Sequence, residues 1–213
     1  MKRFVCIFLA FIMAFTFIAC NKNVENAEKT ANEKTSSDTS NDGKEQETLK
    51  SDGKTLVVFY SATGNTKAAA ERIADVLKAD IFEIEPRQPY SSEDLDWNNE
   101  NSRVNIEHED ETKRDVALEK TTPQNWEQYE TVYIGYPIWW GIAAWPVSSF
   151  VKSNNFGEKT VVPFCTSASS ELGSSVELLK SQSNSGKWTD GKRFSSNVSN
   201  EEIDEWVSEI AVN

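Results

Sequence analysis

The residues best suited to binding chemistry form a polar turn at positions 61–66, directly after an apolar run at 56–60. A short run rich in valine and aromatic residues predicts a strand buried on both faces. Residues 67–77 combine strong helix formers with an apolar stripe, which predicts a helix. A turn between such a strand and a helix start gathers unpaired backbone N–H groups and the positive end of the helix dipole. The side chains of Ser61, Thr63, Asn65 and Thr66 add donors, so we predict a phosphate-binding turn.

The turn lacks the sequence features of the common nucleotide-binding loops. There is no GxxxxGK[ST] pattern to place a lysine at a β- or γ-phosphate, and no GxGxxG pattern to let a pyrophosphate approach the backbone. A neutral turn with hydroxyl groups suits a single monoester phosphate. The alternative is that Ser, Thr, Asn and Gly only cap the helix, as they often do. The turn alone does not decide between these two interpretations.

Two more turns with useful side chains follow later predicted strands. Residues 137–141 place two indoles before a glycine, and an aromatic ring stacked on an indole gains about 0.5–1.5 kcal/mol beyond burial. Residues 166–173 offer hydroxyl and backbone N–H groups for the polar edge of such a ring. Taken singly, Trp139 and Trp140 are as readily explained as core or interface residues. Cys165 ends an apolar strand, which favours an inert buried thiol.

The elements that position these turns alternate along the chain. We predict strands near 55–60, 81–85, 131–136, 160–165 and 192–195, and helices over 67–77, from Pro146 through 147–152, over 171–182, and from residue 199 or 200 onward. Alternation of this kind predicts an α/β fold, a three-layer doubly wound parallel sheet of five strands in the order 2-1-3-4-5. Ligands bind such sheets beyond the carboxyl ends of the strands, where all three turns lie.

The segment from residue 87 to 128 gives the weakest pattern. Residues 92–96 could start a helix, and a few apolar residues are scattered among polar ones, among them Leu95, Trp97, Val104 and Ile106. We expect an irregular helix with long loops near a cofactor, or a lid. The single histidine, His108, lies in an acidic stretch and is expected to be a solvated surface residue.

The three turns together resemble the flavodoxins, and most closely a small bacterial flavodoxin-like family with a Gly-Tyr-Pro-Ile-Trp-Trp-Gly turn. The matching motifs are YSATGNT, GYPIWWGIAAWP and PFCTSASSELGSS, within residues 54–211. The resemblance implies a flavodoxin-like domain over residues 54–213 with FMN as cofactor. It implies phosphate contacts from the first turn, ring contacts from the second, and contacts on the other side of the ring from the third. The implied residues are Ser61, Ala62, Thr63, Gly64, Asn65, Thr66, Pro137, Ile138, Trp139, Trp140, Gly141, Thr166, Ser167, Ala168 and Gly173.

The N-terminal part has the composition of an export signal and a tether. Residues 1–20 combine Lys2-Arg3 with a sixteen-residue, largely apolar run and end at Ala19-Cys20, which is similar to the cleavage site of a bacterial lipoprotein. We therefore expect lipid on Cys20 and an extracytoplasmic, membrane-anchored protein. An uncleaved anchor or an ordinary signal peptide is the alternative. Residues 21–53 are almost free of large apolar residues, which predicts a disordered linker.

Composition narrows the functions further. With 22 basic and 34 acidic residues the chain offers no basic face for nucleic acid, and one histidine without a CxxC motif gives no recognisable zinc site. We expect electron transfer to a redox partner protein or to a small-molecule acceptor. The first alternative is an NAD(P)H-dependent FMN oxidoreductase acting on a quinone or another small acceptor. The second is a non-catalytic lipoprotein that has lost flavin binding.

Overall fold

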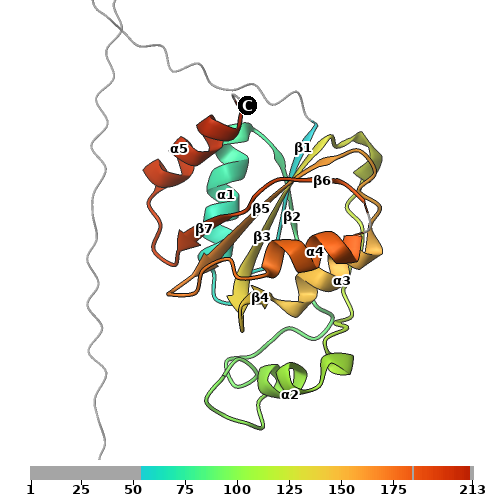
Figure 1. Ribbon diagram of the computed structural model, residues 1–213, viewed down its shortest axis with the longest axis vertical. Coiled ribbons are helices and arrows are strands. Elements are labelled where there is room, and N and C mark those ends of the chain that lie inside the picture. The colour runs from blue at the N-terminus through green and yellow to red at the C-terminus, as the bar shows by residue number, and fades with distance from the viewer. Residues whose placement is uncertain (1–53, 184, 212–213) are drawn as a thin grey trace, which may run out of the picture. The chain divides into compact units, whose positions relative to one another are not determined.

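The computed structural model describes residues 54–183 and 185–211. The predicted export signal over 1–20, Cys20 and the linker over 21–53 lie outside the described residues. Five α-helices and seven strands follow one another along the described chain (Figure 1). They are β1 (Thr55–Phe59), α1 (Asn65–Leu77), β2 (Asp80–Glu83), α2 (Arg103–Glu109), β3 (Thr131–Trp139), β4 (Ile142–Ala143), α3 (Trp145–Ser153), β5 (Thr160–Ser167), α4 (Ser175–Ser183), β6 (Lys187–Trp188), β7 (Lys192–Ser195) and α5 (Asn200–Ala211).

The strands form one parallel sheet in the order β2-β1-β3-β5-β6, in which β7 also pairs with β5 and β4 pairs antiparallel with β3. The α/β class and the relative positions of the first four predicted strands are confirmed. The number of strands was predicted wrongly. The strand expected at 192–195 is β7, and the two short strands β4 and β6 were not predicted. β6 and β7 pair with the same edge of β5, since Lys187 pairs with Thr160 and Lys192 with Phe164. The turn-forming pair Asp190-Gly191 lies between β6 and β7.

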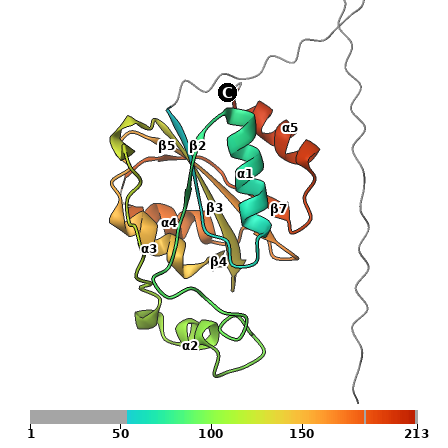
Figure 2. The ribbon, with the colours of Figure 1, turned by 180° about the vertical axis from the view of Figure 1, so that it is seen from behind.

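Helices cover both faces of the sheet, with α1 and α5 on one side and α3 and α4 on the other (Figures 1 and 2). The central strands bury alternate residues on the two faces, as the two-residue period of a strand requires. On β1, Val57 and Phe59 pack with α1 and α5, while Leu56 and Val58 pack with α3. Both faces are therefore apolar, which explains why β1, β3 and β5 are nearly continuous hydrophobic runs. The described residues include no helix long and apolar enough to span a membrane.

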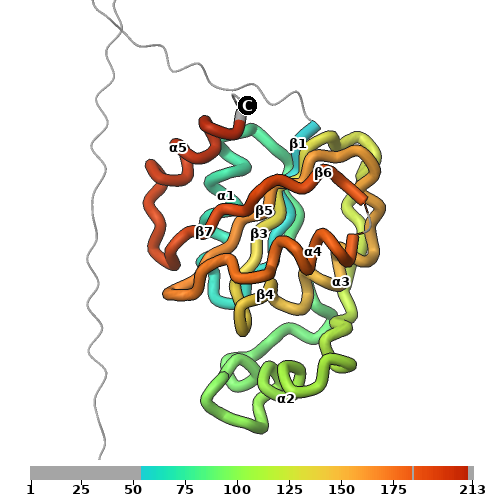
Figure 3. Tube along the Cα trace, viewed as in Figure 1, coloured from blue at the N-terminus to red at the C-terminus, as the bar shows by residue number. Residues whose placement is uncertain are grey.

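The segment between β2 and β3 contributes little regular structure. It forms α2 and two short 3-10 helices, Glu111–Lys113 and Trp126–Gln128. The helix start expected at 92–96 is wrong, because the chain makes only a turn there and Ser102 caps α2 instead. Asx turns explain why no helix begins in this segment before residue 102. The side chains of Asp96 and Asn99 each accept the backbone N–H of the residue two positions later. The segment around α2 lies beyond the end of the sheet that carries β4 (Figure 3).

Candidate functional site

A cavity of about 560 Å³ opens at the carboxyl ends of β1, β3 and β5. This volume is within the usual range of small-ligand and cofactor sites. Its lining comes from all three predicted turns, from the segment that contains α2, and from Ser196 directly after β7. The lining residues are Thr63, Asn65, Leu95, Trp97, Val104, Pro137, Ile138, Trp139, Trp140, Thr166, Ser167, Ala168, Ser169, Ser170 and Ser196.

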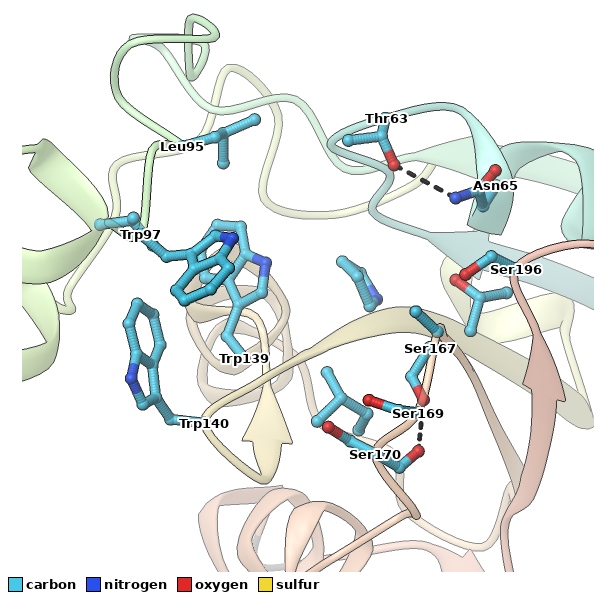
Figure 4. Close-up of a pocket in the computed structure, with 15 residues that line it drawn as sticks. Thr63, Asn65, Leu95, Trp97, Trp139, Trp140, Ser167, Ser169, Ser170 and Ser196 are labelled. Carbon is cyan, nitrogen blue, oxygen red and sulfur yellow. Dashed lines mark hydrogen bonds between the residues drawn. The ribbon is translucent and has the colours of Figure 1, made fainter. Parts of the chain in front are cut away.

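The lining is divided into an aromatic end and a hydroxyl end (Figure 4). Trp97, Trp139 and Trp140 lie together at one end with Leu95 nearby. Thr63, Asn65 and Ser196 lie at the other, and the serines of the third turn lie between. An elongated ligand with a flat apolar ring at one end and a polar anionic group at the other matches this division.

The first turn leaves the start of α1 without a side-chain cap. Gly64 occupies the N-cap position in the left-handed conformation, with φ of 92°, and has no side chain that could accept an N–H of the first helical turn. The Ser61 hydroxyl accepts the N–H of Gly64 at 3.1 Å, and the Asn65 amide donates weakly to the Thr63 hydroxyl at 3.4 Å. The helix-capping interpretation therefore holds for Gly64 alone, because no side chain of the turn caps α1. Thr63 and Asn65 line the cavity, and Figure 4 shows the Thr63 hydroxyl facing the Asn65 amide.

Thr66 has a different position from the other polar residues of this turn. Its hydroxyl is buried and shares a hydrogen bond of 2.8 Å with the hydroxyl of Thr166 at the end of β5. This bond joins the first turn to the third across the sheet. Thr66 thus supports the cavity from behind, and Thr166 is the member of the pair that lines it.

The second turn is a two-residue hairpin between β3 and β4. Trp139 pairs with Ile142, and the intervening Trp140 and Gly141 have φ of 47° and 78°. Positive φ at both central residues characterises the type I′ turn that suits the twist of a hairpin. For a tryptophan the left-handed conformation costs about 1–2 kcal/mol, so neighbouring contacts must offset it.

The two indoles of this turn have different surroundings. Trp139 makes edge contacts with Tyr60, Tyr90 and Trp145, at centroid distances of 5.9, 5.2 and 5.4 Å. Trp140 lies parallel to His108, with centroids 4.3 Å apart, and to Trp145 at 6.2 Å. The expectation that His108 is a solvated surface residue is wrong, since its ring is stacked and its Nδ1 is buried.

The third turn is held by contacts to its backbone. The Ser167 hydroxyl donates to the Ser170 carbonyl, and the Arg193 guanidinium of β7 donates to the carbonyls of Ser167, at 3.1 Å, and Ala168. Farther along, Gly173 adopts φ of 57° and packs on the carbonyl of Gly141, which accepts the N–H of Ser174 at 3.3 Å. The second and third turns therefore stabilise each other behind the cavity.

Two tyrosines near the aromatic end hold their protons more tightly than usual. Burial raises the pKa of Tyr60 far above its usual value, and burial together with a hydrogen bond to Glu107 does the same for Tyr90. Burial also raises the pKa of the Cys165 thiol to about 12, and the thiol is fully buried. The interpretation of Cys165 as an inert small hydrophobe is confirmed.

The structure brings most of the sequence-predicted residues into one cavity. Gly141 and Gly173 lie behind it, Gly64 and Thr66 support the first turn, and Ser61 and Ala62 line a neighbouring cavity of about 330 Å³. Their contacts with a ligand stay predictions. Sequence reasoning missed four cavity residues: Leu95, Trp97, Val104 and Ser196. Ser169 and Ser170 belong to the predicted third turn but were not named individually. The scattered apolar residues of the 87–128 segment were the available signal for three of them.

Comparisons with known proteins agree with this architecture. A family model described as flavodoxin matches residues 54–210. A crystal structure of a candidate flavoprotein from Bacteroides uniformis is 36% identical, with a TM-score of 0.67 over 73% of this chain and 98% of the other. One from Bacteroides eggerthii is 39% identical, with a TM-score of 0.67 over 75% and 99% of the two chains. A flavoprotein from Lactobacillus acidophilus, crystallised in complex with FMN, is 21% identical, with a TM-score of 0.56 over 72% and 98%. No curated protein matches the chain significantly.

Proposed function

The chain belongs to the flavodoxin family, and on that premise we propose that it binds one FMN in the cavity at the carboxyl ends of β1, β3 and β5 and carries electrons. The observation that carries the proposal is the division of one cavity into a hydroxyl end and an aromatic end. FMN has the same two parts, a monoester phosphate and a flat tricyclic ring. The Lactobacillus acidophilus flavoprotein that shares this fold was crystallised with FMN.

The donor groups at the hydroxyl end fit a phosphate monoester. Thr63, Asn65 and Ser196 offer side-chain donors, and the uncapped start of α1 offers backbone N–H groups and the positive end of its dipole. In the second turn, Trp139 and Trp140 would exclude water from the ring. FMN supplies the redox chemistry when bound, and the protein sets the potential through packing, charge and water exclusion.

The charge of the chain supports electron transfer at a low potential. The formal net charge is −12, and negative charge around a redox centre opposes the gain of an electron. We therefore expect the midpoint potential of the bound flavin to lie below that of free FMN and to rise with ionic strength. A redox titration at two salt concentrations measures both effects.

Comparing FMN with riboflavin, which lacks the phosphate, tests the binding mode. We expect saturable quenching of FMN fluorescence at one equivalent per chain, and weaker binding of riboflavin. The Thr63→Val variant should weaken FMN binding and leave riboflavin binding unchanged, because it removes a donor at the hydroxyl end only. Thr122→Val is the matched control, since Thr122 is exposed and does not line the cavity. Equal affinity for FMN and riboflavin in the wild type would contradict the proposal.

We also propose that lipid on Cys20 anchors the protein at the extracytoplasmic face of the membrane, with residues 21–53 as a tether. The motif Ala19-Cys20 after an apolar run supports this proposal. A Cys20→Ser variant should move the protein from the membrane fraction to the soluble fraction. Mass spectrometry that finds the intact Met1 peptide in the membrane fraction would contradict cleavage.

Steady-state kinetics separate an electron carrier from an NAD(P)H-dependent reductase. A carrier exchanges electrons with a reduced partner and oxidises NADH or NADPH only slowly. Rapid oxidation of either nicotinamide with a quinone acceptor would assign the protein to the reductases of this fold instead.

A further inference from the structure

The segment between β2 and β3 contributes its own residues to the cavity. Leu95, Trp97 and Val104 line it beside the two tryptophans of the second turn. Of these three, Trp97 has the most unusual environment, because 70% of its surface is exposed. Leaving a large indole in water forgoes much of the free energy that its burial would contribute.

The backbone of Trp97 is nonetheless held in place. The side-chain amide of Asn105 on α2 lies 3.0 Å from the carbonyl of Trp97 and 2.8 Å from that of Asn99. The N–H of Val104 donates to the carbonyl of Asp94 at 3.0 Å, on the other side of the same loop. These hydrogen bonds hold the backbone of the loop against α2. The backbone that carries the exposed indole of Trp97 is therefore fixed in position.

The segment is in turn fastened to the aromatic end of the cavity. Arg103 lies 3.8 Å above the ring of Tyr90, Glu107 accepts the Tyr90 hydroxyl at 2.6 Å, and His108 stacks on Trp140. These contacts join α2 to Trp140 of the second turn and to Tyr90, whose ring contacts Trp139. Because α2 is attached both to the aromatic end of the cavity and to the loop of Trp97, it determines where Trp97 lies relative to the cavity.

The three tryptophans that line the cavity differ in the number of aromatic rings that they contact. Trp139 is engaged by three aromatic rings and Trp140 by two. Within residues 54–183 and 185–211, the Trp97 ring has no aromatic partner. Figure 4 shows its indole at the aromatic end, on the side of the cavity opposite the hydroxyl groups.

We propose that Trp97 supplies an aromatic face for the ring of the bound ligand, with Asn105 as its positioning residue. This inference rests on the proposed function, since it assumes a flat ring at that end of the cavity. The proposal assigns part of the cofactor site to the segment between β2 and β3, which lies outside the sheet and the helices that cover it. Ring binding then depends on α2 as well as on the strand-end turns.

Titrations of the full chain with FMN and with riboflavin test the assignment. The variants are Trp97→Ala, Trp97→Phe and Asn105→Ala, with Ile106→Ala as the control, because Ile106 is an exposed apolar residue of α2 that does not line the cavity. Trp97→Ala should weaken FMN and riboflavin binding by the same factor, about three- to tenfold. Trp97→Phe should retain most of the affinity. Asn105→Ala should lose part of it although the indole is present, and Ile106→Ala should match the wild type.

Oxidation of Trp97 provides a second test that does not depend on the measured affinities. Mild oxidation of tryptophan followed by peptide mass spectrometry should modify Trp97 first in the ligand-free protein, and FMN should protect it. The inference is overturned if Trp97→Ala binds both flavins as the wild type does, or weakens FMN alone, or if FMN leaves the oxidation of Trp97 unchanged. Wild-type protein that binds neither flavin would instead overturn the proposed function, and this inference with it.

Discussion

The imidazole of His108 lies flat against the indole of Trp140, with ring centroids 4.3 Å apart and ring planes 10° apart. His108 is in the last turn of α2, and Trp140 is at the tip of the hairpin between β3 and β4. The stack therefore joins the segment between β2 and β3 to a hairpin turn whose backbone is strained at Trp140. Stacking of this kind offsets part of the cost of the left-handed conformation of Trp140.

Replacing His108 should separate the contribution of the stacked ring from that of its nitrogen. His108→Ala removes the stack and should lower the free energy of unfolding by about 1 kcal/mol. His108→Phe keeps a flat ring and removes the buried Nδ1, which has no hydrogen-bond partner, so stability should equal or exceed that of the wild type. Urea unfolding of the three proteins measures the difference. Equal stability of the Ala and Phe variants would argue against the stack.

The hydrogen bond between Thr66 and Thr166 should be visible as an energetic coupling. Thr66→Val or Thr166→Val leaves one buried hydroxyl without its partner, at a cost of about 1–3 kcal/mol. The double variant removes both hydroxyl groups and should be more stable than the sum of the single effects predicts. A double-mutant cycle in urea provides the test, and strictly additive losses would show that the bond contributes nothing.

The close contact of the second and third turns predicts unequal costs for two glycine substitutions. Gly141→Ala and Gly173→Ala both force an alanine to positive φ. A Cβ on Gly141 meets no atom within 4 Å, whereas a Cβ on Gly173 would lie 2.3 Å from the Gly141 carbonyl oxygen. Gly173→Ala should therefore be the more destabilising by at least about 1 kcal/mol. Thermal or urea unfolding that ranks them equally would contradict this packing.

Burial of Cys165 predicts a pH-dependent stability. The folded thiol has a pKa of about 12, while an unfolded thiol titrates near 8.5. The folded protein then holds the proton more tightly, so this contribution is complete below about pH 8.5 and is lost as the pH rises toward the folded pKa. Between pH 8 and 10, Cys165→Ala should show a shallower loss of stability than the wild type.

Labelling provides a second check on Cys165. The native thiol should react with iodoacetamide at pH 8.5 far more slowly than the unfolded one, as measured on its own peptide by mass spectrometry. Equal rates in the two states would mean that the thiol is accessible.

The strands and the three turns were predictable because local patterns encode them. The central strands are buried on both faces, so their apolar runs stand out, and the turn after each combines polar, glycine or indole residues that do not continue a strand. The fold class follows from the alternation of these signals. The two-residue strand β6 was not predicted, because Lys187 and Trp188 are too short a run to show a strand period.

The aromatic end of the cavity was only half predictable. Trp139 and Trp140 lie in a motif, whereas Trp97, Asn105 and His108 reach the site through contacts between separate loops. Such contacts depend on the path of a segment with little periodicity. For the same reason, the burial of Thr66 could not be distinguished from a role in phosphate binding, because both require a hydroxyl at that position.

The absorbance spectrum of the purified full-length protein tests the central claim most directly. We expect the visible bands of an oxidised flavin, and FMN released by acid in a ratio of one per chain, either as isolated or after incubation with FMN and removal of the excess. A colourless protein that retains no FMN after this treatment would contradict the account.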